Sequence, residues 1–185
     1  MEFKKIQLNG FKSFAEKTNF LIEDGLTGIV GPNGCGKSNI VESLRWVMGE
    51  TSAKSMRGSG MEDVIFSGTS NKSSKNIAEV SIDVENNNKE GPVQYRELKQ
   101  IQVRRKIEKD KGSKFYINDK EVRARDAQMF FADLSTGAHS PSMISQGRIG
   151  ALVTAKPTDR RAILEEAAGI SGLHVRRHEA ELRLG

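Results

Sequence analysis

A glycine-rich stretch near the N-terminus constrains the fold of this chain more than any other feature. An apolar run rich in β-branched residues, 26–30, precedes it. The residues after it that are predicted to share one face of a helix ending near Gly49 are Ile40, Val41, Leu44, Val47 and Met48. The run predicts a buried strand, the spacing predicts an amphipathic helix, and glycines let the backbone turn tightly between the two. The sequence therefore predicts a strand, a glycine loop and a helix over residues 26–48.

The loop itself, residues 31–38, reads Gly-Pro-Asn-Gly-Cys-Gly-Lys-Ser and matches the pattern of a phosphate-binding loop. In such a loop the backbone amides and the helix N-terminus surround the α- and β-phosphates of a nucleotide. Lys37 is predicted to reach the β- and γ-phosphates, and Ser38 to ligate Mg²⁺. The plainer alternative is an ordinary glycine turn with Lys37 as a surface charge. Because the flanking strand and helix are those that the motif requires, we favour a site for a nucleotide and Mg²⁺.

Positive charge is concentrated in one segment of the chain. The net charge of the 185 residues is +5, yet residues 99–125 alone hold ten basic and four acidic residues. Such a segment is typical of a protein that contacts a polyanion such as DNA, and Arg104, Arg105 and Lys106 are the candidate contacts. A solvated strand face is often as basic, so both interpretations stay open at this point.

The sequence gives no indication of a membrane partner. No apolar run approaches the roughly 20 residues of a membrane-spanning helix, and no signal-peptide pattern follows Met1. We therefore expect a cytoplasmic protein, in agreement with a single cysteine, which cannot form an internal disulfide. That residue, Cys35, lies in the phosphate loop. We hypothesise that it reacts with alkylating agents and that bound nucleotide protects it, although a small residue merely tolerated there is the simpler interpretation.

The rest of the sequence alternates between strand-like and helical patterns. Strands are predicted at 3–8, 19–22, 78–85 and 101–107, a hairpin at 115–122 and a helix at 126–134. The strict alternation over 78–85 is typical of an antiparallel strand with one solvated face. A further helix is predicted from Thr158, and the apolar spacing after Gly172 suits a coiled-coil seam. The sequence thus predicts an α/β lobe with a mixed, partly antiparallel sheet at 1–157, and a helix leading into a coiled coil at 158–185.

One part of a complete nucleotide hydrolase is not recognisable. Such an enzyme needs an apolar strand that ends on an aspartate for Mg²⁺, often with a glutamate beside it as base. The nearest candidates are Asp133, in a helical pattern, and Asp83, in a half-exposed strand, and both fit structural roles better. The chain therefore looks like half of an ATPase. Two alternatives stay open: a small P-loop enzyme, such as a nucleotide kinase, that uses one of these aspartates, and a DNA-binding module with a vestigial nucleotide site.

Five segments of the sequence form a recognisable set. They are Phe-Lys-Ser-Phe at 11–14, the phosphate loop at 31–39, Met-Glu-Asp-Val-Ile-Phe at 61–66, Ser-Gln-Gly at 145–147 and Arg-Ala-Ile-Leu-Glu-Glu-Ala-Ala-Gly-Ile-Ser-Gly at 161–172. Together, and in this order, they resemble the N-terminal head segment of bacterial SMC proteins, the chromosome-organising ATPases. The resemblance extends over the whole chain. It implies the N-terminal lobe of an ABC-type P-loop head that ends in the start of a coiled coil.

The resemblance also implies roles for particular residues. In the family Lys12 and Ser13 lie near the nucleotide, Arg57 matches an arginine that approaches the phosphates, and Gln146 matches a glutamine that ligates Mg²⁺ and senses the γ-phosphate. Lys37 and Gln146 are thus the residues expected to act in catalysis. The loop residues expected to contact nucleotide are Pro32, Asn33, Gly34, Cys35, Gly36, Lys37, Ser38 and Asn39. Taken without the resemblance, Lys12 and Arg57 would be assigned as solvated charges, Ser13 as a turn residue and Gln146 as a polar group at a strand end.

The family further implies what this segment works with. The signature motif, the Walker B acids and most of the coiled coil lie C-terminal to the matching segment, so we expect the chain alone to bind nucleotide weakly and not to hydrolyse it. The implied partners are the C-terminal lobe of the same head, a second head, DNA, and a kleisin-type subunit with its associated protein. The implied function is ATP-driven head engagement and hydrolysis that condense chromosomal DNA at the nucleoid. The head of a related DNA-repair ABC ATPase is the nearest alternative.

Overall fold

The computed structural model describes residues 1–89 and 92–134, and also 150, 153–158, 160, 161, 164 and 168. Up to residue 134, the described residues form one six-stranded sheet, two α-helices and three short 3-10 helices. The strands are β1 (Glu2–Asn9), β2 (Thr18–Leu21), β3 (Ile77–Glu85), β4 (Gln100–Glu108), β5 (Gly112–Ile117) and β6 (Lys120–Val122). The helices are α1 (Lys37–Val47), α2 (Ala124–Asp133), η1 (Lys54–Met56), η2 (Met61–Val64) and η3 (Val93–Tyr95).

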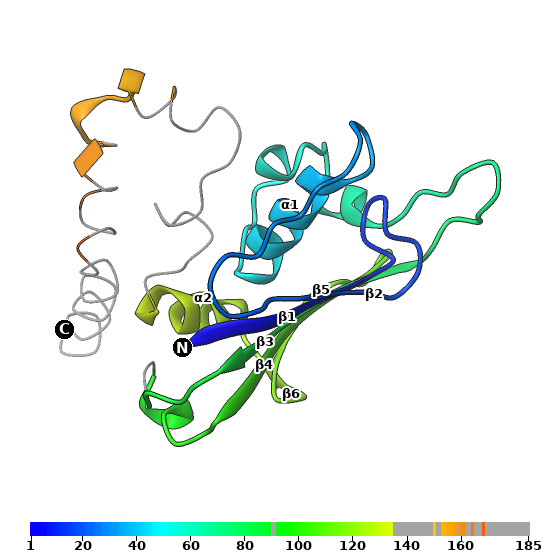
Figure 1. Cartoon of the computed structure of the whole chain (residues 1–185). Coiled ribbons are helices and arrows are strands. Elements are labelled where there is room, and N and C mark those ends of the chain that lie inside the picture. Colours follow the sequence, from blue (N-terminus) through cyan, green and yellow to red (C-terminus); the bar gives the residue numbers. More distant parts are fainter. Residues whose placement is uncertain are drawn as a thin grey trace.

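The sheet has the strand order β2-β1-β3-β4-β5-β6 (Figure 1). Every pairing among these six strands is antiparallel. In the register of the central strands, Ile82 of β3 lies opposite Ile6 of β1 on one side and Val103 of β4 on the other. Asn118 and Asp119 join β5 to β6 with φ of 47° and 64°, as the tight two-residue turn of a hairpin requires. The predicted strands at 3–8, 19–22, 78–85 and 101–107, the hairpin and the antiparallel pairing are confirmed.

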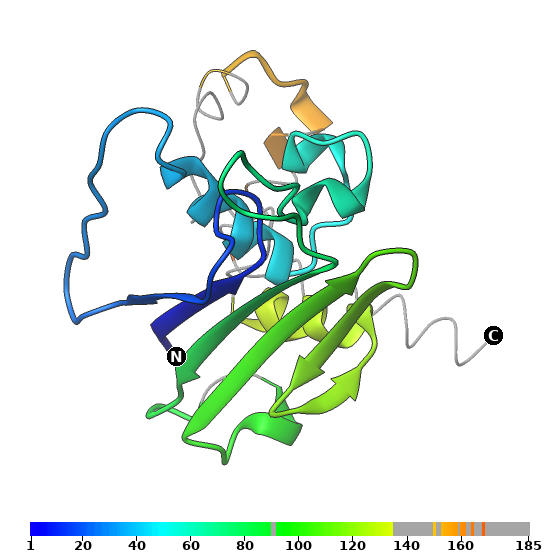
Figure 2. The same cartoon turned by 90° about the vertical axis from the view of Figure 1, so that its right-hand side faces the viewer.

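The run 26–30 does not form a strand, contrary to the prediction. It belongs to a loop that leaves the sheet and returns at the start of α1 (Figure 2). Leu26 and Val30 are 98% and 94% exposed. A strand is stable only beside a hydrogen-bonding neighbour and with an apolar surface to cover, and the described part of the chain offers this run neither. The described sheet therefore lacks the parallel pairs that would make it mixed.

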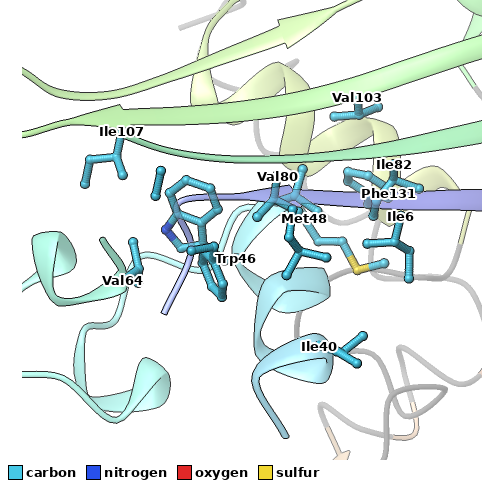
Figure 3. Close-up of a cluster of buried hydrophobic side chains, with 14 of the residues drawn as sticks. Ile6, Ile40, Trp46, Met48, Val64, Val80, Ile82, Val103, Ile107 and Phe131 are labelled. Carbon is cyan, nitrogen blue, oxygen red and sulfur yellow. The ribbon is translucent and has the colours of Figure 1, made fainter. Parts of the chain in front are cut away.

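Both α-helices pack on one face of the sheet and share its core. Figure 3 shows Trp46 and Met48 close beneath Val80 of β3, with Phe131 of α2 in the same cluster. Trp46 and Phe131 are fully buried, as are the inward-facing side chains of β3 and β4. Alternate residues of the central strands thus supply one wall of the core, and the helices supply the other.

The buried face of α1 differs from the predicted one. Three residues of the predicted face are buried as expected, namely Ile40, Val47 and Met48. Val41 and Leu44 are only half-buried, and the core takes up Trp46 instead. Two polar residues of α1, Glu42 and Ser43, are also buried. Ser43 is satisfied by the helix itself, because its hydroxyl donates to the carbonyl oxygen of Ile40 at 2.7 Å, whereas Glu42 needs partners from elsewhere.

The opposite face of the sheet is polar. Asp83 of β3 pairs with Lys5 of β1 at 2.6 Å and accepts a hydrogen bond from Gln102 of β4 at 2.7 Å. Arg104 of β4 pairs with Glu79 of β3 at 3.2 Å. The alternation predicted over 78–85 is therefore confirmed, with one face in the core and one face in contact with water.

Several predictions fall outside the described residues. They concern Gln146, the segment 145–147 and most of the helix and coiled coil predicted after Thr158. The division into 1–157 and 158–185 stays a prediction for the same reason. In the part of the chain that is described, no helix combines the length and apolar character that crossing a membrane would take.

Candidate nucleotide-binding site

The phosphate loop leads into α1 and leaves the start of that helix open. Gly34 and Gly36 have φ of 84° and 96°, a region that is unfavourable for residues with a side chain. The first turn of α1 holds no acidic residue, and no side chain caps it. Because a helix N-terminus carries partial positive charge and amide groups without helical partners, this end of α1 is suited to bind an anion.

The side chain of Lys37 folds back over this loop. Its Nζ donates hydrogen bonds to the carbonyl oxygens of Gly31 at 2.5 Å and Pro32 at 2.6 Å. These bonds wrap the loop around a positive charge. A phosphate at the start of α1 would meet the ammonium group of Lys37 and the loop amides together, so the arrangement fits the polyphosphate of a nucleotide.

Three other predicted residues meet beside the loop. Arg57, in the turn after η1, donates from Nη2 to Oδ1 of Asn39 at 2.9 Å, and Nδ2 of Asn39 donates to Oγ of Ser13 at 2.9 Å. A Cβ at Gly36 would lie 2.5 Å from Oγ of Ser13, so this hydroxyl sits against the loop itself. The fold therefore brings together side chains from three separate segments at the N-terminal end of α1.

Sequence reasoning missed Glu42, which holds two of the predicted residues. Its carboxylate accepts a hydrogen bond from Nζ of Lys12 and forms an ion pair with Nε of Arg57. Residue 42 lies four positions after Ser38 and so on the same side of the helix, one turn further on. A carboxylate at that spacing, in a helix otherwise packed into the core, is the sequence feature that could have predicted a role for Glu42 at the site.

The residues expected to bind Mg²⁺ are described only in part. Ser38 is exposed at the start of α1, where its hydroxyl is a suitable ligand beside phosphate oxygens and water. Among the described residues there is no group of three His, Cys, Asp or Glu side chains that could hold a metal. Asp83 is paired with Lys5 on the polar face of the sheet, the face away from α1. This placement disfavours Asp83 as a metal ligand, and Asp133 belongs to α2, as its helical pattern predicted.

The structure changes the group predicted to contact DNA. Arg105 lies on the core side of β4 and is only 3% exposed. Its guanidinium carbon is 4.5 Å from the ring centre of Trp46 and 4.6 Å from that of Phe115. We therefore withdraw Arg105 from this group. Strand alternation was the overlooked signal, because Arg105 is in phase with the apolar residues of β4, whereas Arg104 and Lys106 face the polar side.

These observations define a class of protein. A glycine loop around a lysine, at the start of a helix that packs on a sheet, is the phosphate-binding part of a P-loop nucleotide-binding lobe. The family model described as the RecF/RecN/SMC N terminal domain matches residues 2–148. The chain therefore belongs to this family, and the resemblance drawn from five sequence segments is confirmed.

Curated relatives agree with this assignment. The chain is 56% identical over 184 residues to the chromosome partition protein Smc of Cereibacter sphaeroides, and 54% identical over 184 residues to that of Rhodopseudomonas palustris. In both comparisons the whole of this chain is matched, but it spans only 16% of the relative. The chain is thus similar to a limited part of these long proteins.

Solved structures are similar over most of the chain. An Smc head bound to the C-winged helix domain of ScpA superposes with a TM-score of 0.84 at 30% identity, covering 92% of this chain and 52% of that one. A Pyrococcus furiosus Smc head with an extended coiled coil, bound to the C-terminal domain of ScpA, gives 0.83 at 29% identity, covering 98% and 45%. The fold is therefore that of the N-terminal lobe of an SMC head.

Proposed function

We propose that this chain is the ATP-binding half of an SMC head, in a protein whose ATP-driven head engagement and hydrolysis organise and condense chromosomal DNA. The observation that carries the proposal is the arrangement at the start of α1. Lys37 donates to two loop carbonyls there, and Arg57, Asn39 and Ser13 are linked by hydrogen bonds beside it. These groups offer a polyphosphate both cationic and neutral donors from several sides.

Each residue of the site has a proposed task. The loop amides and the start of α1 bind the α- and β-phosphates of ATP, and the Lys37 ammonium turns from the loop carbonyls towards the β- and γ-phosphates. Ser38 and Gln146 ligate Mg²⁺, which would neutralise charge on the phosphates. Arg57 approaches the phosphates from the side, while Lys12 and Ser13 hold the segment after β1 against the nucleotide.

We propose that the C-terminal lobe of the same head completes the site. The loop 26–30 supports this, because it exposes apolar side chains that a partner strand and a covering element would bury. In the full protein that lobe would supply the acidic residues missing here, and a second head would close over the nucleotide. A solved Smc head carries a domain of ScpA, and we propose a kleisin-type partner of this kind, with its associated protein, for the protein to which this chain belongs.

DNA contact is proposed for Arg104 and Lys106 on the polar face of β4. Both lie in the segment 99–125 that holds the excess positive charge. Arg104 is engaged by Glu79 at 3.2 Å and by Asp119 at 2.8 Å, so a phosphate would have to displace these carboxylates. Reversing the charge of Lys106 should weaken DNA binding and flatten its dependence on salt. If affinity and salt dependence are both unchanged, this surface does not contact DNA.

The first experiment is a steady-state ATP hydrolysis assay of this chain with Mg²⁺, beside Lys37→Ala and with nucleotide binding measured in parallel. We expect detectable binding that Lys37→Ala removes, and no turnover above that of the variant. If ATP hydrolysis appeared only when the C-terminal lobe was added, this would directly support the proposal that the chain supplies one half of the active site. Robust turnover by the chain alone, lost in Lys37→Ala, would show that the metal-binding acid is already present and would overturn the proposal.

A further inference from the structure

Glu42 is a buried carboxylate in the middle of the candidate site. Its side chain is 10% exposed, and its two oxygens face two different cations: Oε2 meets Nζ of Lys12, and Oε1 meets Nε of Arg57. A buried charge is costly unless ionic partners and hydrogen bonds compensate for it. This carboxylate is compensated twice, and both partners are residues predicted to lie near the nucleotide.

The two cations come from separate segments that Glu42 joins. Lys12 lies in the turn after β1, and Arg57 follows η1. Both have backbone φ in the left-handed region, 47° and 54°, which side-chain-bearing residues adopt only where their surroundings hold them. Nζ of Lys12 also donates to the carbonyl oxygen of Met56, the residue before Arg57. The ionic contacts of Glu42 therefore fix two strained turns relative to one helix.

The same contacts extend to the phosphate loop. Arg57 uses Nε for Glu42 and keeps Nη2 for Asn39, which in turn holds Ser13 against Gly36. A change at Glu42 would thus alter where the guanidinium of Arg57 lies relative to the start of α1. The side chain of Arg57 is 58% exposed, so packing against other side chains does little to hold it. Its ion pair with Glu42 and its hydrogen bond to Asn39 are therefore the contacts that orient its guanidinium.

We propose that Glu42 is a positioning residue: it orients Arg57 and Lys12 at the nucleotide site and thereby sets the rate of ATP hydrolysis. The inference rests on the proposed ATP site and deepens it. Glu42 itself touches no phosphate in this scheme. It acts through the two cations, so its removal leaves them present but no longer oriented.

The test is a double-mutant cycle in the full-length protein, with steady-state ATP hydrolysis as the readout. We expect Glu42→Gln to lower kcat about tenfold with KM for ATP changed less than about twofold, because both cations stay present and only their orientation is lost. Arg57→Ala removes the guanidinium itself and should lower kcat at least as much. Glu42→Gln should slow Arg57→Ala by much less than it slows the unchanged protein, because only its effect through Lys12 is left. Glu42→Asp, which keeps the charge, should recover part of the rate.

Asp83→Asn is the matched control. It removes a partly buried carboxylate that also holds a lysine and a polar neighbour, but on the face of the sheet away from α1, and kcat should not change. If Glu42→Gln slows Arg57→Ala by as much as it slows the unchanged protein, Glu42 acts independently and the inference fails. If Glu42→Gln does not fold, the cycle is run with Glu42→Asp, whose shorter side chain should slow the unchanged protein less than Glu42→Gln would but should slow Arg57→Ala less still. Should Lys37→Ala bind ATP normally, the proposed ATP site itself fails, whatever the cycle shows.

Discussion

At the scale of single residues, the site is built from side chains whose polar atoms have defined partners. Lys37 is held by two loop carbonyls. Asp63, in η2 after the turn that follows Arg57, accepts hydrogen bonds from the amides of Ser59 at 2.7 Å and Gly60 at 2.9 Å, and from the hydroxyl of Ser59 at 2.9 Å. These contacts favour its charged form, so the turn that presents Arg57 depends on a carboxylate.

Asp63 gives a prediction about acid stability. The amide of Gly60 first, and then the hydroxyl and amide of Ser59, hold the pKa of Asp63 below its ordinary value. A carboxyl whose pKa is lowered on folding stabilises the protein above the pKa of the unfolded chain, and this contribution disappears as the pH falls through the folded pKa. We therefore expect Asp63→Asn to lower stability at neutral pH and to lose less stability than the unchanged chain between about pH 5 and pH 2. Urea unfolding across that range measures the difference.

The control for Asp63 is Glu16→Gln. Glu16 is an exposed carboxylate whose neighbour Lys72 is 3.5 Å away, and such pairs contribute little. Its unfolding curve should follow that of the unchanged chain at every pH. If the free energy of unfolding fell by the same amount for Asp63→Asn and for the unchanged chain as the pH was lowered, the assigned role of Asp63 would be contradicted.

Cys35 provides a second test at this scale. It is exposed, and its Sγ lies 3.9 Å from Nζ of Lys37. As the only cysteine in the chain, it reports on the loop without interference. We expect alkylation to proceed readily and to slow several-fold when ATP and Mg²⁺ are added, because a nucleotide would cover the loop. Equal labelling rates with and without ATP would contradict protection, and Cys35→Ser gives the background.

At the scale of elements, Arg105 connects β4 to the C-terminal end of α1. Its Nη1 donates to the carbonyl oxygens of Trp46 and Glu50, both at 2.7 Å, and its Nε donates to the hydroxyl of Ser113 at 2.7 Å. Burial lowers the pKa of Arg105 to about 10, which leaves it charged at neutral pH. A cation at the negative end of a helix is favourable, and this one fixes the helix that carries the phosphate loop to the sheet.

We therefore expect Arg105→Met to lower the free energy of unfolding by roughly 3 kcal/mol, because it leaves buried carbonyl groups without their donor. Arg104→Met, one position earlier but on the polar face, should cost about 1 kcal/mol or less. Urea titration monitored by the fluorescence of the single tryptophan, Trp46, measures both. Similar losses for the two variants would show that the core-side hydrogen bonds of Arg105 add little.

At the scale of the whole molecule, the loop 26–30 is an apolar segment exposed to solvent. The side chain of Val30 is almost fully exposed, as is that of Val93 at the N-terminal end of η3. Surface positions of this kind tolerate substitution in an isolated domain. An exposed apolar run becomes important only where a partner covers it.

This contrast predicts the behaviour of Val30→Asp. We expect it to change the stability of this chain by less than about 0.5 kcal/mol, yet to prevent association with the C-terminal lobe, because the charge would be buried in the new interface. Val93→Asp is the control and should affect neither. Co-purification of the two lobes, with thermal unfolding of each variant, tests both expectations. Normal association of Val30→Asp would place the C-terminal lobe elsewhere.

The sequence alone determined the local elements and the chemistry of the loop. Alternation predicts β1, β3 and β4, a two-residue turn predicts the β5–β6 hairpin, and the motif predicts Lys37 at a helix start, because these features depend on neighbours a few positions apart. The tertiary structure decided what depends on distant partners. The run 26–30 has the composition of a buried strand, but among the described residues no strand lies beside it to form backbone hydrogen bonds. Arg105 is charged, yet it is buried because backbone carbonyls at the end of α1 accept its hydrogen bonds and two aromatic rings pack against it. Glu42 contacts Lys12 and Arg57 only because the fold brings two turns distant in sequence together at α1.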